Sequence, residues 1–251
     1  MSSTPSQNGA LSVNPLLRAS VFAVNIILML SLIACSDETD SNQGSNNPSQ
    51  PPTLESPANP VSDASICFPS YMQPGKTITT TTNTSILENG NTSTFTVTTQ
   101  NAYSNGIFYG QNALQETSED GSGTSQFYAI DTANKTVTNL GSTYCVVIGS
   151  ATRSYLLTPG QSTELNYQWG CNGQVSDNIQ TTYTFIGFEK ISVPAGTFDS
   201  CKFEVLETQS GNTKSYTIHL RQGDGVQLMY ESSISGANES YSTELVSMEI
   251  N

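Results

Sequence analysis

The sequence predicts an all-β antiparallel domain, and three observations lead to that prediction. Short segments alternate apolar and polar residues with a period of two, which places every second side chain on the same face of a strand. These segments are rich in Thr, Val, Tyr, Ile and Phe, residues that suit a pleated, half-buried surface. Glycine-containing dipeptides separate them, and no helical pattern follows the apolar run near the N-terminus.

The individual strands and turns are recognised from these patterns. The clearest alternating pairs are Phe95 with Val97, Phe127 with its neighbours, Tyr183 with Phe185, Tyr216 with Ile218, and the Leu245-Val246 segment. The separating dipeptides are Asn89-Gly90, Asn105-Gly106, Asn172-Gly173, Gly211-Asn212 and Asp224-Gly225. Such dipeptides supply the positive φ angles that tight hairpins need. We therefore expect a meander of about twelve antiparallel strands that forms a barrel, a half-barrel or a sandwich.

The most distinctive segment is the VPAGTF sequence within residues 187–205. Pro194 has the fixed φ angle that suits the second position of a type I turn, and Gly196 suits the fourth. The segment resembles the VPAGTF hairpin of uncharacterised bacterial exported proteins and lipoproteins with mainly β folds. The resemblance covers about residues 183–251, although Gln227 stands where that family usually has a glycine. It implies a β fold and no particular activity.

The N-terminal region has the pattern of an export signal. Residues 21–34 are uncharged and mostly apolar, with Arg18 upstream, and the run is shorter than the ~20 residues of a spanning helix. The sequence Leu32-Ile33-Ala34-Cys35 resembles the lipobox of bacterial lipoproteins. In that family the cysteine sulfur receives a diacylglycerol, the signal is removed before it, and the new N-terminus is acylated, commonly with palmitate. The resemblance implies a signal peptide at 1–34 and a membrane anchor at Cys35.

The residues after Cys35 bear on location and tethering. In the same family an Asp after the cysteine favours the inner membrane, so Ser36 implies the outer membrane. Asp37-Glu38 resembles surface-export signals, which leaves the periplasmic and surface faces both open. Residues 35–64 are rich in Ser, Asn and Pro and bury too little apolar area to fold, so we expect a disordered tether spanning roughly 30 Å. A single all-β domain should then occupy residues 65–251.

The charge of the chain excludes some partners. All 21 acidic residues follow Cys35, whereas Arg18 is the one cation of eight that precedes it, so the mature charge is 7 minus 21, or −14. Nucleic acids are bound by cations that neutralise phosphates, so a nucleic-acid partner is not expected. The same sign disfavours electrostatic attraction to anionic lipids.

Four cysteines remain for the folded domain, and in an exported chain they predict two disulfides. The candidates are Cys67, Cys145, Cys171 and Cys201. If Val193 faces Thr197 across the Pro194 turn, Cys201 lies opposite about Glu189, far from Cys171 at the other end of that strand. A disulfide needs α-carbons about 5.5 Å apart, so the Cys171–Cys201 pairing is disfavoured and the other two pairings stay open.

The sequence contains little recognisable chemistry. His219 is the only histidine and no Cys-x-x-Cys occurs, so no metal site and no cofactor are expected. His219 alternates with Tyr216 and Ile218, and neither Gly-x-Ser-x-Gly nor Ser-x-x-Lys is present. We therefore predict no catalytic residue.

Several carboxylates and aromatic residues are compatible either with a binding or catalytic site or with an ordinary structural role. Glu204 and Glu207 should lie on opposite faces of one strand, and Glu116, Glu119 and Asp120 are expected in a solvated loop. A set of aromatic residues fits either a sugar or peptide groove or a β core: Trp169, Tyr167, Tyr109, Tyr128 and Phe127.

The favoured interpretation is a non-enzymatic outer-membrane lipoprotein whose domain binds an envelope protein or glycan. One alternative is an envelope glycan hydrolase with paired carboxylates. The other is a half-barrel that binds acyl chains, an analogy at the level of fold. The ligand and the oligomeric state are not determined by the sequence.

Overall fold

The computed structural model describes residues 62–88, 90–119, 124–234 and 239–251. The predicted signal peptide at 1–34, the predicted lipidation site Cys35 and the tether up to residue 61 lie outside these ranges, as does Asp120. In the described ranges, no helix has the length and apolar character needed to cross a membrane.

The described residues form one short 3-10 helix and fourteen strands. The elements are η1 (Ala64–Cys67), β1 (Thr77–Glu88), β2 (Asn91–Phe108), β3 (Gln111–Ser118), β4 (Ser125–Asp131), β5 (Thr136–Ser142), β6 (Cys145–Ser150), β7 (Thr152–Ser154), β8 (Ser162–Cys171), β9 (Gln174–Val175), β10 (Ile179–Val193), β11 (Gly196–Gln209), β12 (Asn212–Arg221), β13 (Gln227–Ile234) and β14 (Ser240–Ile250).

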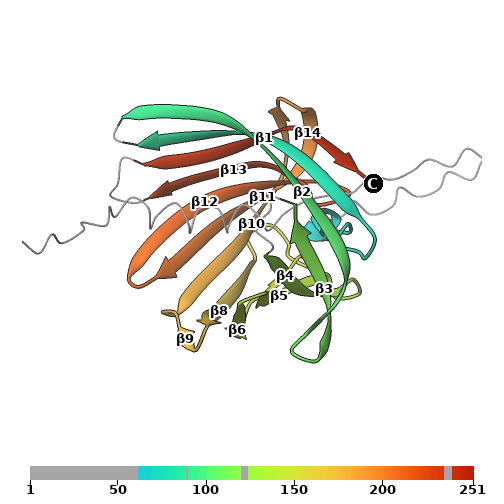
Figure 1. The fold of residues 1–251 in the computed structure, drawn as a ribbon. Helices are drawn as coiled ribbons and strands as arrows, with labels where there is room; N and C mark the ends of the chain where they lie inside the picture. The colour runs from blue at the N-terminus through green and yellow to red at the C-terminus, as the bar shows by residue number, and fades with distance from the viewer. Residues whose placement is uncertain (1–61, 89, 120–123, 235–238) are drawn as a thin grey trace, which may run out of the picture. The chain divides into compact units, whose positions relative to one another are not determined.

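Twelve of the strands form a closed antiparallel barrel, which confirms the predicted all-β meander and selects the barrel among the three expected forms (Figure 1). The strands follow one another from β10 to β14, then from β1 to β6, and finally to β8. The ring closes where β8 pairs with the first part of β10, from Tyr167 opposite Ile179 to Ser162 opposite Thr184. β7 pairs with β5, and β9 pairs with β8 outside the ring.

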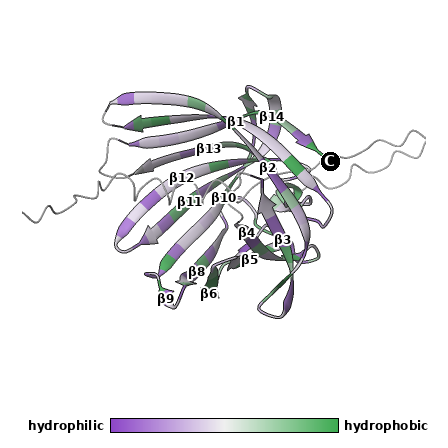
Figure 2. Cartoon of the chain, viewed as in Figure 1, coloured by the Kyte–Doolittle hydropathy of each residue, from purple (hydrophilic) through white to green (hydrophobic). Residues whose placement is uncertain are grey.

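The antiparallel order gives the barrel two distinct ends. The last residues of β1 and β11 and the first residues of β2, β12 and β14 lie at one end, called here the far end. The segment containing η1 and the β10–β11 and β12–β13 connections lie at the other, called here the η1 end (Figure 1). Hydrophobic and hydrophilic residues are interspersed along the strands (Figure 2). Buried and exposed positions alternate from Phe203 to Leu206 in β11, as expected when one face points inward and the other outward.

One predicted turn is wrong. β2 continues through Asn105-Gly106 and the chain reverses at Tyr109-Gly110, where both φ angles are positive (47° and 81°). A Cβ at position 106 would lie 2.9 Å from the Cβ of Gln115 on β3. Glycine at position 106 therefore permits close side-chain packing between neighbouring strands. Tyrosine at a positive φ angle is uncommon, which is why the sequence did not indicate the actual turn.

The Pro194 hairpin forms with a different register from the expected one. Val193 pairs with Gly196 across a two-residue Pro194-Ala195 turn, so Cys201 lies opposite Phe188 and not Glu189. Gly196 has a φ angle of 137°, which suits glycine. The turn also contacts β14, because the main-chain N–H of Ala195 donates a 3.0 Å hydrogen bond to the carbonyl of Leu245.

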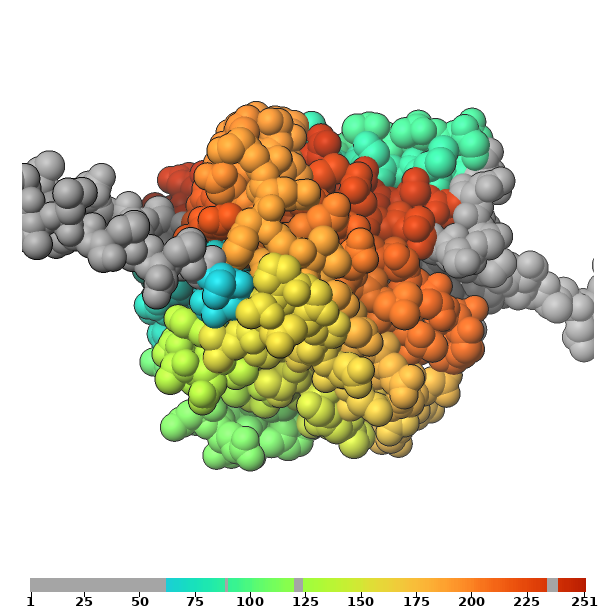
Figure 3. Space-filling model, turned by 180° about the vertical axis from the view of Figure 1, so that it is seen from behind, coloured from blue at the N-terminus to red at the C-terminus, as the bar shows by residue number. Residues whose placement is uncertain are grey.

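The folded part already includes residues before position 65. The Asp63 carboxylate accepts a 2.9 Å hydrogen bond from the Ser65 N–H and caps η1, a helix that the sequence did not predict. Ala64 is fully buried, and its N–H donates to the carbonyl of Leu157. Seen from behind, this cyan segment lies against the yellow part of the chain (Figure 3). Four residues are too few to produce a helical periodicity.

Candidate functional site

A carboxyl group lies deep in the barrel interior. Glu116 on β3 is 2% exposed, and the hydroxyl of Tyr103 donates a 3.1 Å hydrogen bond to its Oε1. Burial raises the pKa of Glu116 to about 7, while the hydroxyls of Tyr128 and Tyr103 act in the opposite direction. The expectation of a solvated loop at Glu116 is therefore wrong, since β3 turns this side chain inward. Glu119 follows the strand and is exposed.

The interior next to this carboxyl group is aromatic and filled. The guanidinium carbon of Arg153 lies 4.9 Å from the ring centre of Tyr155 and 5.2 Å from that of Tyr183, distances typical of cation–π contacts. The gap between these side chains admits no water-sized sphere. Its lining consists of Arg153, Tyr155, Tyr183, Phe203, Ile218 and Leu220. A closed barrel with this interior differs from the acyl-binding half-barrel that the sequence left open.

The far end of the barrel carries a second group of inward-facing side chains, called here the aromatic mouth. It comprises Tyr167, Trp169, Glu207, Lys214, Tyr230 and Tyr241, with Tyr216 beneath them. Register places them on the inner face: Glu207 lies opposite Lys214 on one side and the buried Thr181 on the other. Tyr230 is buried, and the other five side chains are partly exposed.

The rings of the aromatic mouth pack edge to face. The ring centres of Tyr167 and Trp169 are 6.1 Å apart, and those of Tyr230 and Tyr241 are 5.8 Å apart. Tyr216 is tilted against Tyr230 at 5.3 Å. Such pairs hold the rings in defined orientations. The mouth is therefore an ordered surface whose rings retain partial access to solvent.

Glu207 gives the aromatic mouth its polar character. Burial raises the pKa of Glu207, and the ammonium group of Lys214 lowers it. Among the described residues, its carboxyl group forms neither a hydrogen bond nor an ion pair within 4.0 Å. Burial also raises the pKa of Tyr167 and Tyr230, and the charge of Glu207 adds to the effect. Their hydroxyls are thus neutral at pH 7 and can both donate and accept hydrogen bonds.

His219 lies on the outer face of β12 and does not join this site. Its Nδ1 is 3.0 Å from Oε1 of Glu189. Burial lowers the pKa of His219, and the charge of Glu189 raises it. The nearby hydroxyl of Ser200 donates a 2.9 Å hydrogen bond to the main-chain carbonyl of Glu189, and Ser200 is fully buried. This arrangement does not prepare a serine nucleophile, which needs its hydroxyl hydrogen-bonded to a base.

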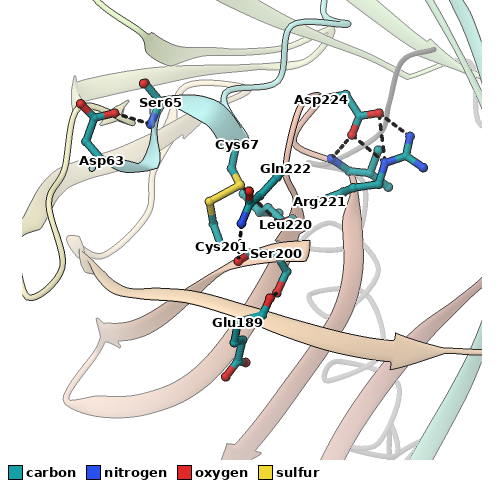
Figure 4. The surroundings of a disulfide bond; sticks show 11 residues. Asp63, Ser65, Cys67, Glu189, Ser200, Cys201, Leu220, Arg221, Gln222 and Asp224 are labelled. Carbon is teal, nitrogen blue, oxygen red and sulfur yellow. Dashed lines mark hydrogen bonds and ion pairs between the residues drawn. A yellow bond between two sulfur atoms is a disulfide. The ribbon is translucent and has the colours of Figure 1, made fainter. Parts of the chain in front are cut away.

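The four candidate cysteines form two disulfides, Cys67–Cys201 and Cys145–Cys171. This is one of the two pairings that the sequence left open. Cys67–Cys201 ties η1 to β11 near the Arg221–Asp224 pair (Figure 4). Cys145–Cys171 joins the paired residues of β6 and β8. In the described part of the chain, no three His, Cys, Asp or Glu side chains gather as a metal site would require.

The remaining predicted residues do not form one site. Tyr128 faces the buried interior, Phe127 packs with Phe108 and Ala113, and Tyr109 is 78% exposed in a turn. Tyr167 and Trp169 do lie together, at the aromatic mouth. Sequence reasoning missed Tyr230 and Tyr241 as their companions, because β8 comes to lie near β13 and β14 at one barrel end only through closure of the ring. The sequence did contain one signal that could have identified this group: aromatic residues at alternating positions close to predicted turns.

Comparisons with known proteins give no family assignment. No protein-family model matches the chain, and no curated protein matches it. A candidate lipoprotein from Parabacteroides distasonis is 12% identical, with 73% of this chain and 98% of that chain covered and a TM-score of 0.44. A candidate exported protein with a YmcC-like fold from Bacteroides fragilis is 12% identical, with 70% and 96% covered and a TM-score of 0.43.

A third structure, the hypothetical lipoprotein YmcC from Escherichia coli, is 13% identical, with 75% of this chain and 90% of that chain covered and a TM-score of 0.33. All three scores are below 0.5, so these likenesses carry no argument about this chain. The barrel is established by its own strand pairing.

Proposed function

We propose that this chain is a lipoprotein of the bacterial outer membrane, anchored through Cys35, whose barrel is a non-enzymatic binding module of the cell envelope. The observation that carries the proposal is the Leu32-Ile33-Ala34-Cys35 sequence at the end of a short apolar run. A single acyl chain gives only reversible membrane binding, whereas the several chains of a mature lipoprotein give a stable anchor.

The structure supports this proposal in two ways. Two disulfides suit an exported protein in an oxidising compartment. The tether would join the barrel at the η1 end, because residue 62 directly precedes the Asp63 cap. The aromatic mouth lies at the opposite end and is thus free to meet a ligand away from the attachment point.

The anchor is tested by intact mass spectrometry of membrane-extracted protein, comparing wild type with Cys35→Ala under reducing and non-reducing conditions. The expected mass begins at Cys35, carries acyl chains, and is four hydrogens lower without reductant. Cys35→Ala should lack the acyl chains. An unacylated wild-type protein would contradict the proposal.

The non-enzymatic part is tested separately. The purified lipoprotein is incubated with cell-envelope glycans and proteins, and products are followed by mass spectrometry. We expect binding without turnover. Turnover that disappears in Glu207→Gln or Glu204→Gln would instead establish a hydrolase.

A further inference from the structure

We infer that the aromatic mouth binds a neutral carbohydrate chain, with Trp169 and Tyr241 as stacking surfaces and Glu207 and Lys214 as hydrogen-bonding groups. This inference names the ligand class of the proposed binding module and rests on that proposal. None of the residues involved belongs to the Cys67–Cys201 region or the buried Glu116 group.

The first argument concerns the rings. Aromatic faces bind the apolar faces of sugar rings, and they do so best when the ring orientation is fixed in advance. Trp169 is held edge to face by Tyr167, and Tyr241 by Tyr230. Trp169, Tyr167 and Tyr241 are partly exposed, unlike the interior tyrosines Tyr155 and Tyr103. The rings at the mouth are thus ordered and still accessible.

The second argument concerns charge. Glu207 and Lys214 are directly opposite on β11 and β12, so the mouth contains one group of each sign. An anionic ligand would meet the Glu207 carboxylate, and a cationic ligand would meet the Lys214 ammonium. A neutral polyol meets neither repulsion and can donate to the carboxylate while accepting from the ammonium. The neutral hydroxyl of the partly exposed Tyr167 adds a group that both donates and accepts.

The third argument disfavours an extended peptide. A peptide strand gains its affinity by pairing with an unpaired sheet edge. The strands that carry the mouth residues, β8 and β11 to β14, are each paired on both sides within the described barrel. A ligand at the mouth must therefore be recognised by side chains, as a carbohydrate is.

The test uses the detergent-extracted lipoprotein in lauryldimethylamine oxide, which carries no sugar headgroup. Trp169 is the only tryptophan of the chain, so its fluorescence reports the mouth directly. Cellohexaose, maltohexaose and chitohexaose serve as neutral probes. Hexaglucosamine and hexagalacturonate serve as cationic and anionic probes of similar length. We expect at least one neutral probe to shift the Trp169 emission and to bind at least tenfold more tightly than both charged probes.

Variants locate the site by calorimetry. Trp169→Ala and Glu207→Gln should each weaken binding of the neutral probe at least tenfold. Tyr109→Ala is the matched control, because Tyr109 is an exposed aromatic residue (78%) in the β2–β3 turn, at the barrel end opposite the mouth, and it should bind like wild type. Circular dichroism confirms that each variant is folded. If the Trp169→Ala variant is folded and binds the neutral probe with unchanged affinity, the inference is overturned.

Two further outcomes would also overturn it: no binding of any neutral probe at millimolar concentration, or tighter binding of a charged probe. Cys35→Ala separates this inference from the proposed anchor, since an unanchored protein keeps the mouth intact. Acylation of the wild type with no glycan binding would remove the carbohydrate inference alone. Glycan binding by an unacylated wild type would remove the anchor alone.

Discussion

Cys67 and Cys201, 134 residues apart in the sequence, are joined by a disulfide that fastens η1 to β11 at one end of the barrel. Cys67 and Cys201 are both fully buried. The second disulfide closes a much shorter loop, since Cys145 and Cys171 are separated by 26 residues. In the chain-entropy view, the longer loop restricts the unfolded chain more strongly.

The two disulfides should therefore differ in their contribution to stability. Loops of these lengths correspond to about 5 and about 3.5 kcal/mol in the chain-entropy model. We expect Cys67→Ser with Cys201→Ser to lower the free energy of unfolding more than Cys145→Ser with Cys171→Ser. Urea unfolding followed by circular dichroism measures both. A larger loss in the Cys145/Cys171 pair would show that loop length does not govern the effect.

Glu116 should make stability depend on pH. Its pKa rises from 4.5 to about 7 on folding, so between these values the folded state binds more protons than the unfolded state. The contribution is fully present below about pH 4.5 and is lost as the pH rises through 7. A shift of this size corresponds to roughly 3 kcal/mol. Glu116→Gln should be stabilising at pH 8 and nearly neutral at pH 5, as measured by urea unfolding at each pH.

Glu204→Gln is the control for removing one negative charge, because Glu204 is exposed on the outer face. It should leave the difference in stability between pH 5 and pH 8 unchanged. If Glu116→Gln retains the wild-type dependence on pH, the buried carboxyl group is not its source.

Gly225 should tolerate alanine much less well than Gly211. The two have nearly the same φ angles, 74° and 77°. A Cβ at position 225 would lie 2.6 Å from the main-chain oxygen of Cys67, whereas a Cβ at 211 would meet no atom within 4 Å. We expect a loss of about 1 kcal/mol for Gly211→Ala from backbone strain alone. Gly225→Ala should cost about 3 kcal/mol or more.

Thermal unfolding of the two glycine variants measures this difference. Equal losses would mean that the φ angle alone decides the cost and that η1 shifts freely away from Gly225.

The Arg221–Asp224 pair should contribute more than the Lys190–Asp199 pair. The Asp224 carboxylate accepts a 2.9 Å hydrogen bond from Nε of Arg221 and a 3.2 Å hydrogen bond from the Val226 N–H. Both side chains are less than 20% exposed. Asp224→Ala removes the carboxylate that pairs with a largely buried cation, which typically costs about 3 kcal/mol.

Lys190 and Asp199 form the control pair, 2.9 Å apart and more than 60% exposed. Asp199→Ala should change the free energy of unfolding by no more than about 0.5 kcal/mol. Urea unfolding of both variants in the same buffer tests the ranking, and a reversed order would refute it.

Local features of the sequence were sufficient to predict the β class and the Pro194 turn. Alternation and turn chemistry act over a few residues, so they can be read without knowing the partner strand. The same local reasoning failed at Asn105-Gly106, where a glycine serves packing against Gln115 and not a turn. It also missed η1, whose helix is held by Asp63 and by the disulfide to Cys201.

The sequence by itself determined that this is a strand-rich chain with a short uncharged apolar run ending at Cys35 and an even set of cysteines after it. Only the tertiary structure decided that β8 closes the ring against β10, that Glu116 is buried, and that Tyr167, Trp169, Tyr230 and Tyr241 share one barrel end. Those features depend on which strands become neighbours. Residues far apart in sequence set that choice, because closing the ring is a long-range pairing that no local pattern specifies.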